Sequence, residues 1–189
     1  MTETASMTGS STELSGTYKL DPTHTRLGFV ARHAMVTKVR GSFSEFDGTL
    51  EIDAADPTRS RGSVVIKVDS VDTGVAQRDE HLRTNDFFDA PSFPEITFTS
   101  TRVDVLGDGR FGVSGDLTIR GVTKPVTIEL EHTGAAKDPF GNDRIGFEGS
   151  TVINRKEWGV NFNAPLEAGG VLVSEKVTLE LDISAVKTA

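Results

Sequence analysis

The chain of 189 residues contains no cysteine. A disulfide framework, a thiolate metal site and a cysteine nucleophile are therefore all excluded. Basic residues are also scarce, since 20 Lys and Arg stand against 28 Asp and Glu, for a formal net charge of −8. Sequence-independent nucleic-acid binding needs a basic surface that neutralises phosphates, so this balance predicts no nucleic-acid partner. No apolar run approaches the ~18–20 residues of a membrane helix, so no integral membrane segment is expected.

The N-terminal segment lacks the features of a secretory signal peptide. Residues 1–16 (MTETASMTGSSTELSG) are rich in Ser, Thr and Gly and include two acidic residues. They contain no basic region followed by an apolar one. We therefore expect an unstructured tail over residues 1–16, a single domain over residues 17–189 and a cytoplasmic location.

From residue 17 onward, apolar residues alternate with polar ones at a period of two. This pattern is typical of antiparallel strands with one solvated face. Only two helical segments are expected, a short helix over residues 72–83 and a helical turn over residues 35–39. The pattern predicts one short strand at residues 17–20 and eight long strands at residues 24–34, 41–53, 61–71, 95–106, 110–120, 124–134, 143–154 and 171–185. Since closure removes exposed sheet edges, the predicted fold is all-β, an extended eight-stranded antiparallel β-barrel with one short helical insertion.

A barrel of eight strands is either filled by its own side chains or holds one small ligand. Small residues occur in phase with large apolar ones on the inferred inner faces, namely Ala31, Ser100, Gly115, Gly149 and Thr151. They favour an apolar cavity along the axis, suited to a long, thin, water-insoluble molecule. The alternative is a filled barrel in which Gly115 and Gly149 mark bends or bulges.

Several motifs resemble one known family. They are residues 24–33 (HTRLGFVARH), 78–82 (RDEHL), 93–98 (FPEITF), 115–126 (GDLTIRGVTKPV) and 154–160 (NRKEWGV). In this order they resemble the YceI-like, lipocalin-like polyisoprenoid-binding proteins, over residues 18 to about 183. The resemblance implies a lipocalin-like barrel with a helical insertion after the third long strand. It also implies a long apolar pocket for a polyisoprenoid, such as an isoprenoid quinone, or another lipid-like amphiphile.

The inward phase and this resemblance together give the candidate site. The apolar pocket is predicted to be lined by Leu27, Phe29, Ala31, Phe46, Leu50, Ile66, Phe98, Val113, Gly115, Leu117, Ile128, Phe147, Gly149, Trp158 and Phe162. The phenylalanines become ligand contacts only if the axis is empty, and are core residues otherwise. Trp158 fits the boundary between pocket and water, or alternatively plugs the barrel as a core residue.

A bound amphiphile has a polar end, which needs partners because unpaired buried polar groups are costly. Four residues are candidates for this polar mouth: His33, Arg78, His81 and Arg155. The alternatives are a satisfied core histidine at position 33 and a solvated helix face carrying Arg78 and His81. His132 continues the inward phase of Ile128 and Leu130, but the four histidines show no metal-binding spacing, so no metal is expected.

The sequence therefore predicts a lipid-binding barrel with no catalytic residues and no cofactor other than a bound lipid. There is no G-x-S-x-G motif to support a serine nucleophile. Two rivals stay open, an enzyme that uses His33 or His81 as a proton shuttle and a filled structural or interaction barrel. The head group, the choice between carrier, storage and sensor, and the oligomeric state also stay open. A homodimer is compatible with the family, but no exposed apolar stripe demands one.

Overall fold

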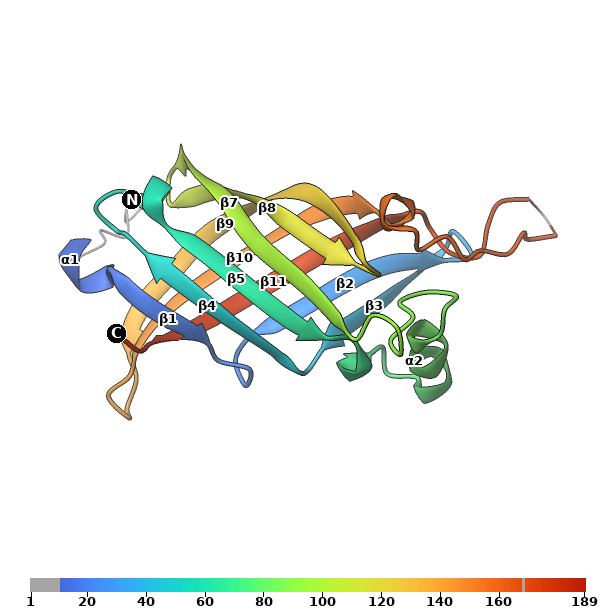
Figure 1. Cartoon of the computed structure of the whole chain (residues 1–189), viewed down its shortest axis with the longest axis horizontal. Coiled ribbons are helices and arrows are strands. Elements are labelled where there is room, and N and C mark those ends of the chain that lie inside the picture. Colours follow the sequence, from blue (N-terminus) through green and yellow to red (C-terminus); the bar gives the residue numbers. More distant parts are fainter. Residues whose placement is uncertain (1–10, 168) are drawn as a thin grey trace, which may run out of the picture.

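The structure is a computed structural model that describes residues 11–167 and 169–189 (Figure 1). These residues form eleven strands, two α-helices and three short 3-10 helices. The strands are β1 (Gly16–Leu20), β2 (Arg26–His33), β3 (Thr37–Phe43), β4 (Phe46–Ile52), β5 (Arg61–Lys67), β6 (Val71–Asp72), β7 (Glu95–Gly107), β8 (Arg110–Ile119), β9 (Val122–Lys137), β10 (Asp143–Asn154) and β11 (Lys176–Lys187). The helices are α1 (Ser11–Leu14), η1 (Pro57–Arg59), η2 (Val68–Ser70), α2 (Ala76–Arg83) and η3 (Arg155–Trp158).

Eight of the strands close into an antiparallel barrel, which confirms the predicted fold class. The ring runs β1–β4–β5–β7–β8–β9–β10–β11, and β11 returns to β1 through pairs such as Tyr18 with Lys187. Closure leaves no edge in this ring exposed to another chain. The expected helical insertion is α2, which follows β5 and β6, so its place after the third long predicted strand is also confirmed.

Three further strands extend the barrel at the end that carries α2. The first half of β11 pairs with β2, from Thr178 opposite Val30 to Asp182 opposite Arg26. β2 pairs with β3, and β3 with the two-residue β6. Figure 1 shows β2 and β3 continuing to the right-hand end of the molecule, beside α2. The barrel is therefore long, and its two ends are built from different segments.

Three sequence predictions about local structure were wrong. The helical turn expected over residues 35–39 is a tight turn between β2 and β3, in which Ala34 and Met35 have positive φ angles of 51° and 61°. The strand expected over residues 41–53 is divided into β3 and β4, because the chain leaves one neighbour, β2, and joins another, β1. The strand expected from residue 171 begins only at Lys176, and the preceding segment makes single bridges, such as His33 with Val173.

Part of the predicted unstructured tail is ordered against the barrel. The Tyr18 hydroxyl donates to the Leu14 carbonyl of α1 at 2.9 Å, and the Ala54 amide donates to the Ser15 hydroxyl at 2.9 Å. Ala54 is distant in sequence and Tyr18 is buried, so the composition of residues 1–16 alone does not reveal either contact. The prediction for residues 1–10 lies outside the described residues.

Two clusters of buried side chains form the core. One surrounds Trp158 and Val68 at the end near α2, and the other surrounds Tyr18 and Ala185 at the opposite end. Within the part of the chain that the structure describes, no helix has the length and apolar character needed to cross a membrane.

Candidate functional site

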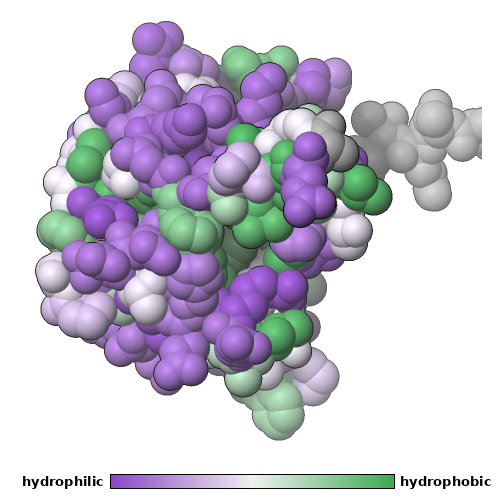
Figure 2. Space-filling view, turned by 90° about the vertical axis from the view of Figure 1, so that its right-hand side faces the viewer, coloured by the Kyte–Doolittle hydropathy of each residue, from purple (hydrophilic) through white to green (hydrophobic). Residues whose placement is uncertain are grey.

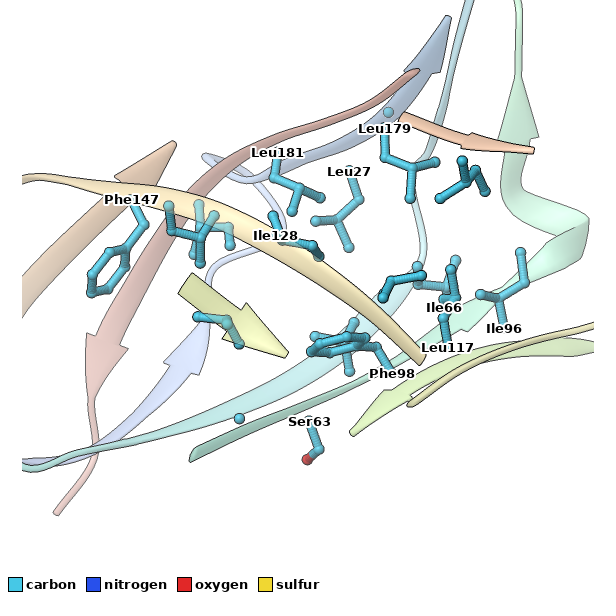
Figure 3. Close-up of a pocket in the computed structure, with 18 of the residues that line it drawn as sticks. Leu27, Ser63, Ile66, Ile96, Phe98, Leu117, Ile128, Phe147, Leu179 and Leu181 are labelled. Carbon is cyan, nitrogen blue, oxygen red and sulfur yellow. The ribbon is translucent and has the colours of Figure 1, made fainter. Parts of the chain in front are cut away.

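A cavity of about 350 Å³ runs through the barrel. Almost all of its lining is apolar and comes from the inward-facing residues of the strands. Figure 3 shows Leu27, Leu179 and Leu181 pointing into it from one side, and Ile66, Phe98 and Leu117 from the opposite side. On β10 the lining extends from Ile145 to Ile153, so the cavity follows that strand for roughly 27 Å. Given the usual strand tilt, this is a tunnel about 20 Å long.

Most of the predicted apolar residues line this tunnel. Those that do are Leu27, Phe29, Ala31, Leu50, Ile66, Phe98, Val113, Leu117, Ile128, Phe147 and Trp158. Alternation identified them because one face of every strand points inward. Their contact with a ligand stays a prediction.

Four predicted pocket residues do not line the tunnel. Phe46 is buried in the cluster around Tyr18, and Phe162 lies after η3, where its ring packs on those of Phe87 and His81 at 5.1 and 5.0 Å. Gly149 faces β9, where a Cβ atom would collide with the Glu129 carbonyl oxygen. A Cβ atom at Gly115 would lie 2.5 Å from the Phe98 ring. The two glycines therefore let neighbouring groups approach, and they do not create the empty axis.

Trp158 and Arg155 line the tunnel at the end near α2. Trp158 is 1 % exposed and its Nε1 donates to the Leu117 carbonyl at 2.9 Å, so it is a core plug and does not lie at a boundary with water. Arg155 is 6 % exposed, and its guanidinium donates to three carbonyl oxygens, those of Ser174 (2.8 Å), Val160 (2.6 Å) and Val173 (3.2 Å).

Arg155 fastens the segment after η3 to the barrel. The charge-assisted bonds to Val160 and Val173 hold two parts of the loop between η3 and β11. No carboxylate of the described residues lies within ion-pair distance of this guanidinium. Burial therefore lowers the pKa of Arg155 from its usual value. All three guanidinium nitrogens donate to backbone carbonyls, so Arg155 lies buried and does not stand at a polar mouth as predicted, although its side chain borders the tunnel.

The other three predicted mouth residues do not line the tunnel. His33 lies exposed at the end of β2, beyond the barrel, although it keeps the inward phase of Ala31. Arg78 donates to the hydroxyl and the carbonyl of Thr73, both at 2.7 Å, and so fixes the start of α2. His81 is exposed and pairs with Asp86 at 2.8 Å. The alternation placed His33 on the correct face of β2, but β2 extends beyond the end of the barrel, so this face is no longer covered there.

One of the lining residues that the sequence candidates missed is His132 on β9. It lines the tunnel, and its Nε2 is buried without a hydrogen-bond partner among the described residues. Its ring lies 5.3 Å from that of Phe147, between centroids. Burial lowers the pKa of His132, and this outweighs a hydrogen bond with the backbone of Gly134 that raises it. The available signal was the phase that His132 shares with Ile128 and Leu130.

The two ends of the tunnel differ in polarity. At the end near α2, the lining is provided by Trp158, by apolar residues of the α2 region such as Leu82 and Phe87, and by Arg155, whose guanidinium is already bonded to backbone carbonyls. Figure 2 views this end, where apolar side chains surround a recess among hydrophilic ones. At the opposite end, the lining includes polar residues of the β4–β5 connection, Asp53, Ser60 and Arg61, together with His132. This arrangement fits a long molecule with one polar end.

Comparison with known proteins places this geometry in a family. Residues 18–185 match the YceI-like domain. A UPF0312 protein of Photorhabdus laumondii is 40% identical over 168 residues, which cover 88% of this chain and 86% of that protein.

Among solved structures, BcnA of Burkholderia cenocepacia has a TM-score of 0.77 at 22% identity, covering 87% of this chain and 98% of that chain. A polyisoprenoid binding domain from Saccharophagus degradans, implicated in plant cell wall breakdown, has a TM-score of 0.66 at 19% identity, covering 90% and 98%. At these identities the two structures show the shared fold. The domain match and the sequence relative go further, and on their evidence the chain belongs to the family of proteins with a YceI-like domain.

Proposed function

We propose that this protein binds a polyisoprenoid or a similar long amphiphile inside the barrel, without chemically changing it. The observation that carries the proposal is the continuous apolar tunnel of about 350 Å³, within the size range of small-molecule sites. An apolar cavity of this kind gives water few hydrogen bonds, so replacing water by a hydrocarbon chain is favourable. Among proteins of the same fold, the Saccharophagus degradans domain is described as polyisoprenoid binding, which supports the same ligand class here.

The driving force is transfer of the ligand tail from water. Burying roughly 300 Å² of apolar ligand surface would contribute roughly 7 kcal/mol before the cost of ordering the chain. A smooth apolar wall discriminates by length and width more than by chemistry, so we expect broad tolerance for tail type. Transport, storage and sensing of a lipid all begin with this binding step.

Both rival functions are less well supported. A catalytic use of His33 or His81 requires either side chain to reach the tunnel, and neither lines it. A filled barrel is inconsistent with the cavity volume.

The test is ligand capture by the intact chain. Native mass spectrometry of protein purified from its own host should show a bound lipid that is released on denaturation. The delipidated protein should then take up a fluorescent prenyl analogue. Protein that carries no lipid and takes up no analogue would overturn the proposal.

A matched pair of variants locates the binding. Val113 faces the tunnel between Val103 and Ile128, whereas the next residue, Ser114, bonds through its hydroxyl to Thr127 on the exposed outer face. Val113→Trp should abolish uptake of the analogue by filling the lumen, and Ser114→Trp should leave it within about twofold, since no apolar contact with the ligand is lost. Equal uptake by the two variants would place the ligand outside the barrel.

A further inference from the structure

The β2–β3 hairpin (residues 26–43) differs in charge from the rest of the chain. It contains four Arg and Lys residues and neither Asp nor Glu, in a protein whose formal net charge is −8. Near the base of the hairpin, Arg26 and Arg40 share one acidic partner, Glu180 of β11. The hairpin is therefore a locally basic segment of an acidic protein.

Two of its cations lie opposite each other near the tip. Arg32 of β2 is the register partner of Lys38 of β3, and both residues are exposed. The Arg32 guanidinium donates to the Val36 carbonyl at 3.2 Å, but no carboxylate of the described residues forms an ion pair with either cation. Like charges directly opposite each other weaken the pairing of two strands. The fold itself therefore does not explain this pair.

The tip of the hairpin exposes apolar side chains on a turn that disfavours them. Ala34 and Met35 have positive φ angles, which Asn and Gly adopt at lower cost. Met35 and Val36 are nevertheless 63 % and 75 % exposed. The tip is held in place, because the Ala34 amide donates to the Leu172 carbonyl at 2.7 Å, and Val171 beside it is exposed as well. Exposed apolar residues grouped in this way are typical of an interaction surface.

The opposite end of the barrel also exposes apolar side chains, but among acidic ones. Val105 and Leu106 of β7 are exposed, and they lie in the sequence between Asp104 and Asp108. Figure 1 shows the turn between β7 and β8 toward the left-hand end of the molecule, and the tip of the β2–β3 hairpin at the right-hand end. Of these two turns, the β2–β3 tip combines apolar side chains with unpaired positive charge.

This combination matches the layers of an anionic lipid bilayer. Amphipathic segments that carry Lys and Arg bury their apolar side chains at the boundary between acyl chains and head groups, and anionic lipids strengthen the binding. We propose that the β2–β3 hairpin docks on an anionic bilayer. Met35 and Val36 enter the apolar layer, and the cations behind them contact the head groups.

The position of the hairpin connects this docking to the tunnel. Ala31 of β2 lines the tunnel, and so does Val173, which forms a bridge with His33. Docking would thus bring the α2 end of the tunnel, where Figure 2 shows a recess, to the membrane from which an amphiphile is taken. This step rests on the proposed binding of a long amphiphile in the tunnel.

Vesicle flotation of the intact chain tests the role of the charges. The wild-type chain should bind phosphatidylcholine vesicles with about 30 mol % phosphatidylglycerol at least about tenfold more tightly than phosphatidylcholine alone. Lys38→Gln should weaken binding to the anionic vesicles about fivefold, the ratio that about 1 kcal/mol produces, and Lys38→Glu about 25-fold. Since Lys38→Glu replaces a like-charge pair by an opposite-charge pair with Arg32, its thermal midpoint should not fall. Lost binding by this variant is then not a result of unfolding.

A double variant tests the apolar tip. Met35→Asn combined with Val36→Thr should weaken binding to the anionic vesicles about tenfold. Asn adopts a positive φ more readily than Met, and Thr has nearly the shape of Val, so the turn should be retained. The matched control is Val105→Thr combined with Leu106→Asn in the opposite hairpin, which should bind within about twofold of wild type.

A fluorescent label reports the depth of the tip directly. The chain contains no cysteine, so a single introduced one can be labelled alone. The emission of an NBD dye on Val36→Cys should shift to the blue when anionic vesicles are added, because the dye enters the apolar layer. The same dye on Leu106→Cys should show no shift.

The outcomes separate this inference from the function on which it rests. If the wild-type chain does not bind anionic vesicles, or if Lys38→Glu and the double variant at the tip bind as tightly as wild type, the inference is wrong. Uptake of the prenyl analogue from solution would then still support the proposed function. A wild-type dimer that forms in place of vesicle binding, and that either variant dissociates, would assign the hairpin to a contact between two copies and would also overturn the inference. If the chain docks through the hairpin but takes up no analogue, the proposed function fails while the docking stands.

Discussion

The two ends of the tunnel handle buried polar groups in opposite ways. At the α2 end, the indole nitrogen of Trp158 and all three guanidinium nitrogens of Arg155 donate to backbone carbonyls. At the other end, Nε2 of His132 has no partner among the described residues. Both groups border the same cavity.

The contrast distinguishes polar groups that stabilise the fold from a polar atom that does not. A side chain whose hydrogen bonds are all made within the protein fixes the shape of the tunnel and has little left to offer a ligand. A buried side chain with an unpaired polar atom destabilises the folded protein slightly. Deleting polar groups at the two ends should therefore change stability by amounts that differ in size and in sign.

The largest effect is expected for Trp158→Ala. Removing a fully buried indole leaves a cavity and an unsatisfied Leu117 carbonyl, and should cost about 3–5 kcal/mol of unfolding free energy. Urea unfolding measures this as a fall in the midpoint. Trp158→Phe keeps most of the volume and should cost less than half as much. A loss below about 1 kcal/mol for the alanine variant would show that the α2 end does not depend on this plug.

The second largest effect is expected for Arg155→Met, which should lower the unfolding free energy by about 3 kcal/mol. Methionine keeps much of the aliphatic stem but leaves the carbonyls of Val160, Val173 and Ser174 without their donor. Arg155→Lys is the control for charge. One ammonium group cannot reproduce the three bonds of the planar guanidinium, so the unfolding free energy of this variant should lie between those of wild type and Arg155→Met. Full stability of the lysine variant would mean that the charge matters and the three bonds do not.

The contrast also shows what the sequence could predict. Alternation along each strand identified the barrel and eleven of the tunnel residues, because inward and outward positions differ in polarity at a period of two. The same pattern placed His33 on the inner face, but local periodicity does not reveal where a strand leaves the barrel. The turn at Ala34 and Met35 was missed because neither residue is typical of a positive φ.

The alternation of apolar and polar residues could not predict hydrogen bonds between side chains and groups distant in sequence. Arg155 meets Ser174 and Trp158 meets Leu117 only after the chain has closed. His132 had the right phase, yet whether its ring nitrogens are paired depends on three-dimensional neighbours. The small residues Gly115 and Gly149 suggested a hollow axis for a reason that the structure does not support, since both accommodate close neighbours.

A smaller, pH-dependent effect is expected for Arg144→Gln, at the outside of the His132 end. The Arg144 side chain donates to Asp21 and Asp138, both at 2.7 Å, which joins the β1–β2 turn to the β9–β10 connection. Chiefly through this bond, with a contribution from His24, the pKa of Asp21 falls to about 2 from 3.8. A carboxyl group with a lowered pKa stabilises the folded state above its unfolded value and loses this contribution as pH falls through the folded one.

Arg144→Gln should thus lower the thermal midpoint at pH 6, and its difference from wild type should shrink between pH 4 and pH 2. Arg61→Gln is the control, because its ion pair with Glu51 is more exposed and should contribute little. A difference that is constant over this pH range would indicate that Arg144 acts by packing.

The smallest effect on stability, and the one that decides the comparison, is expected for His132→Phe. The substitution removes the unpaired Nε2, while an aromatic ring remains against Phe147. Because the substitution removes a buried polar atom that has no partner, the unfolding free energy should stay within about 1 kcal/mol of wild type, on the stabilising side. Urea unfolding of ligand-free protein measures it, with Arg155→Met analysed in parallel. If both variants lost about 3 kcal/mol of unfolding free energy, the polar side chains at both ends would be fully hydrogen-bonded, and Nε2 would have a partner within the fold. A near-neutral His132→Phe beside a strongly destabilised Arg155→Met would instead show that internal hydrogen bonds stabilise the α2 end of the tunnel and not the His132 end.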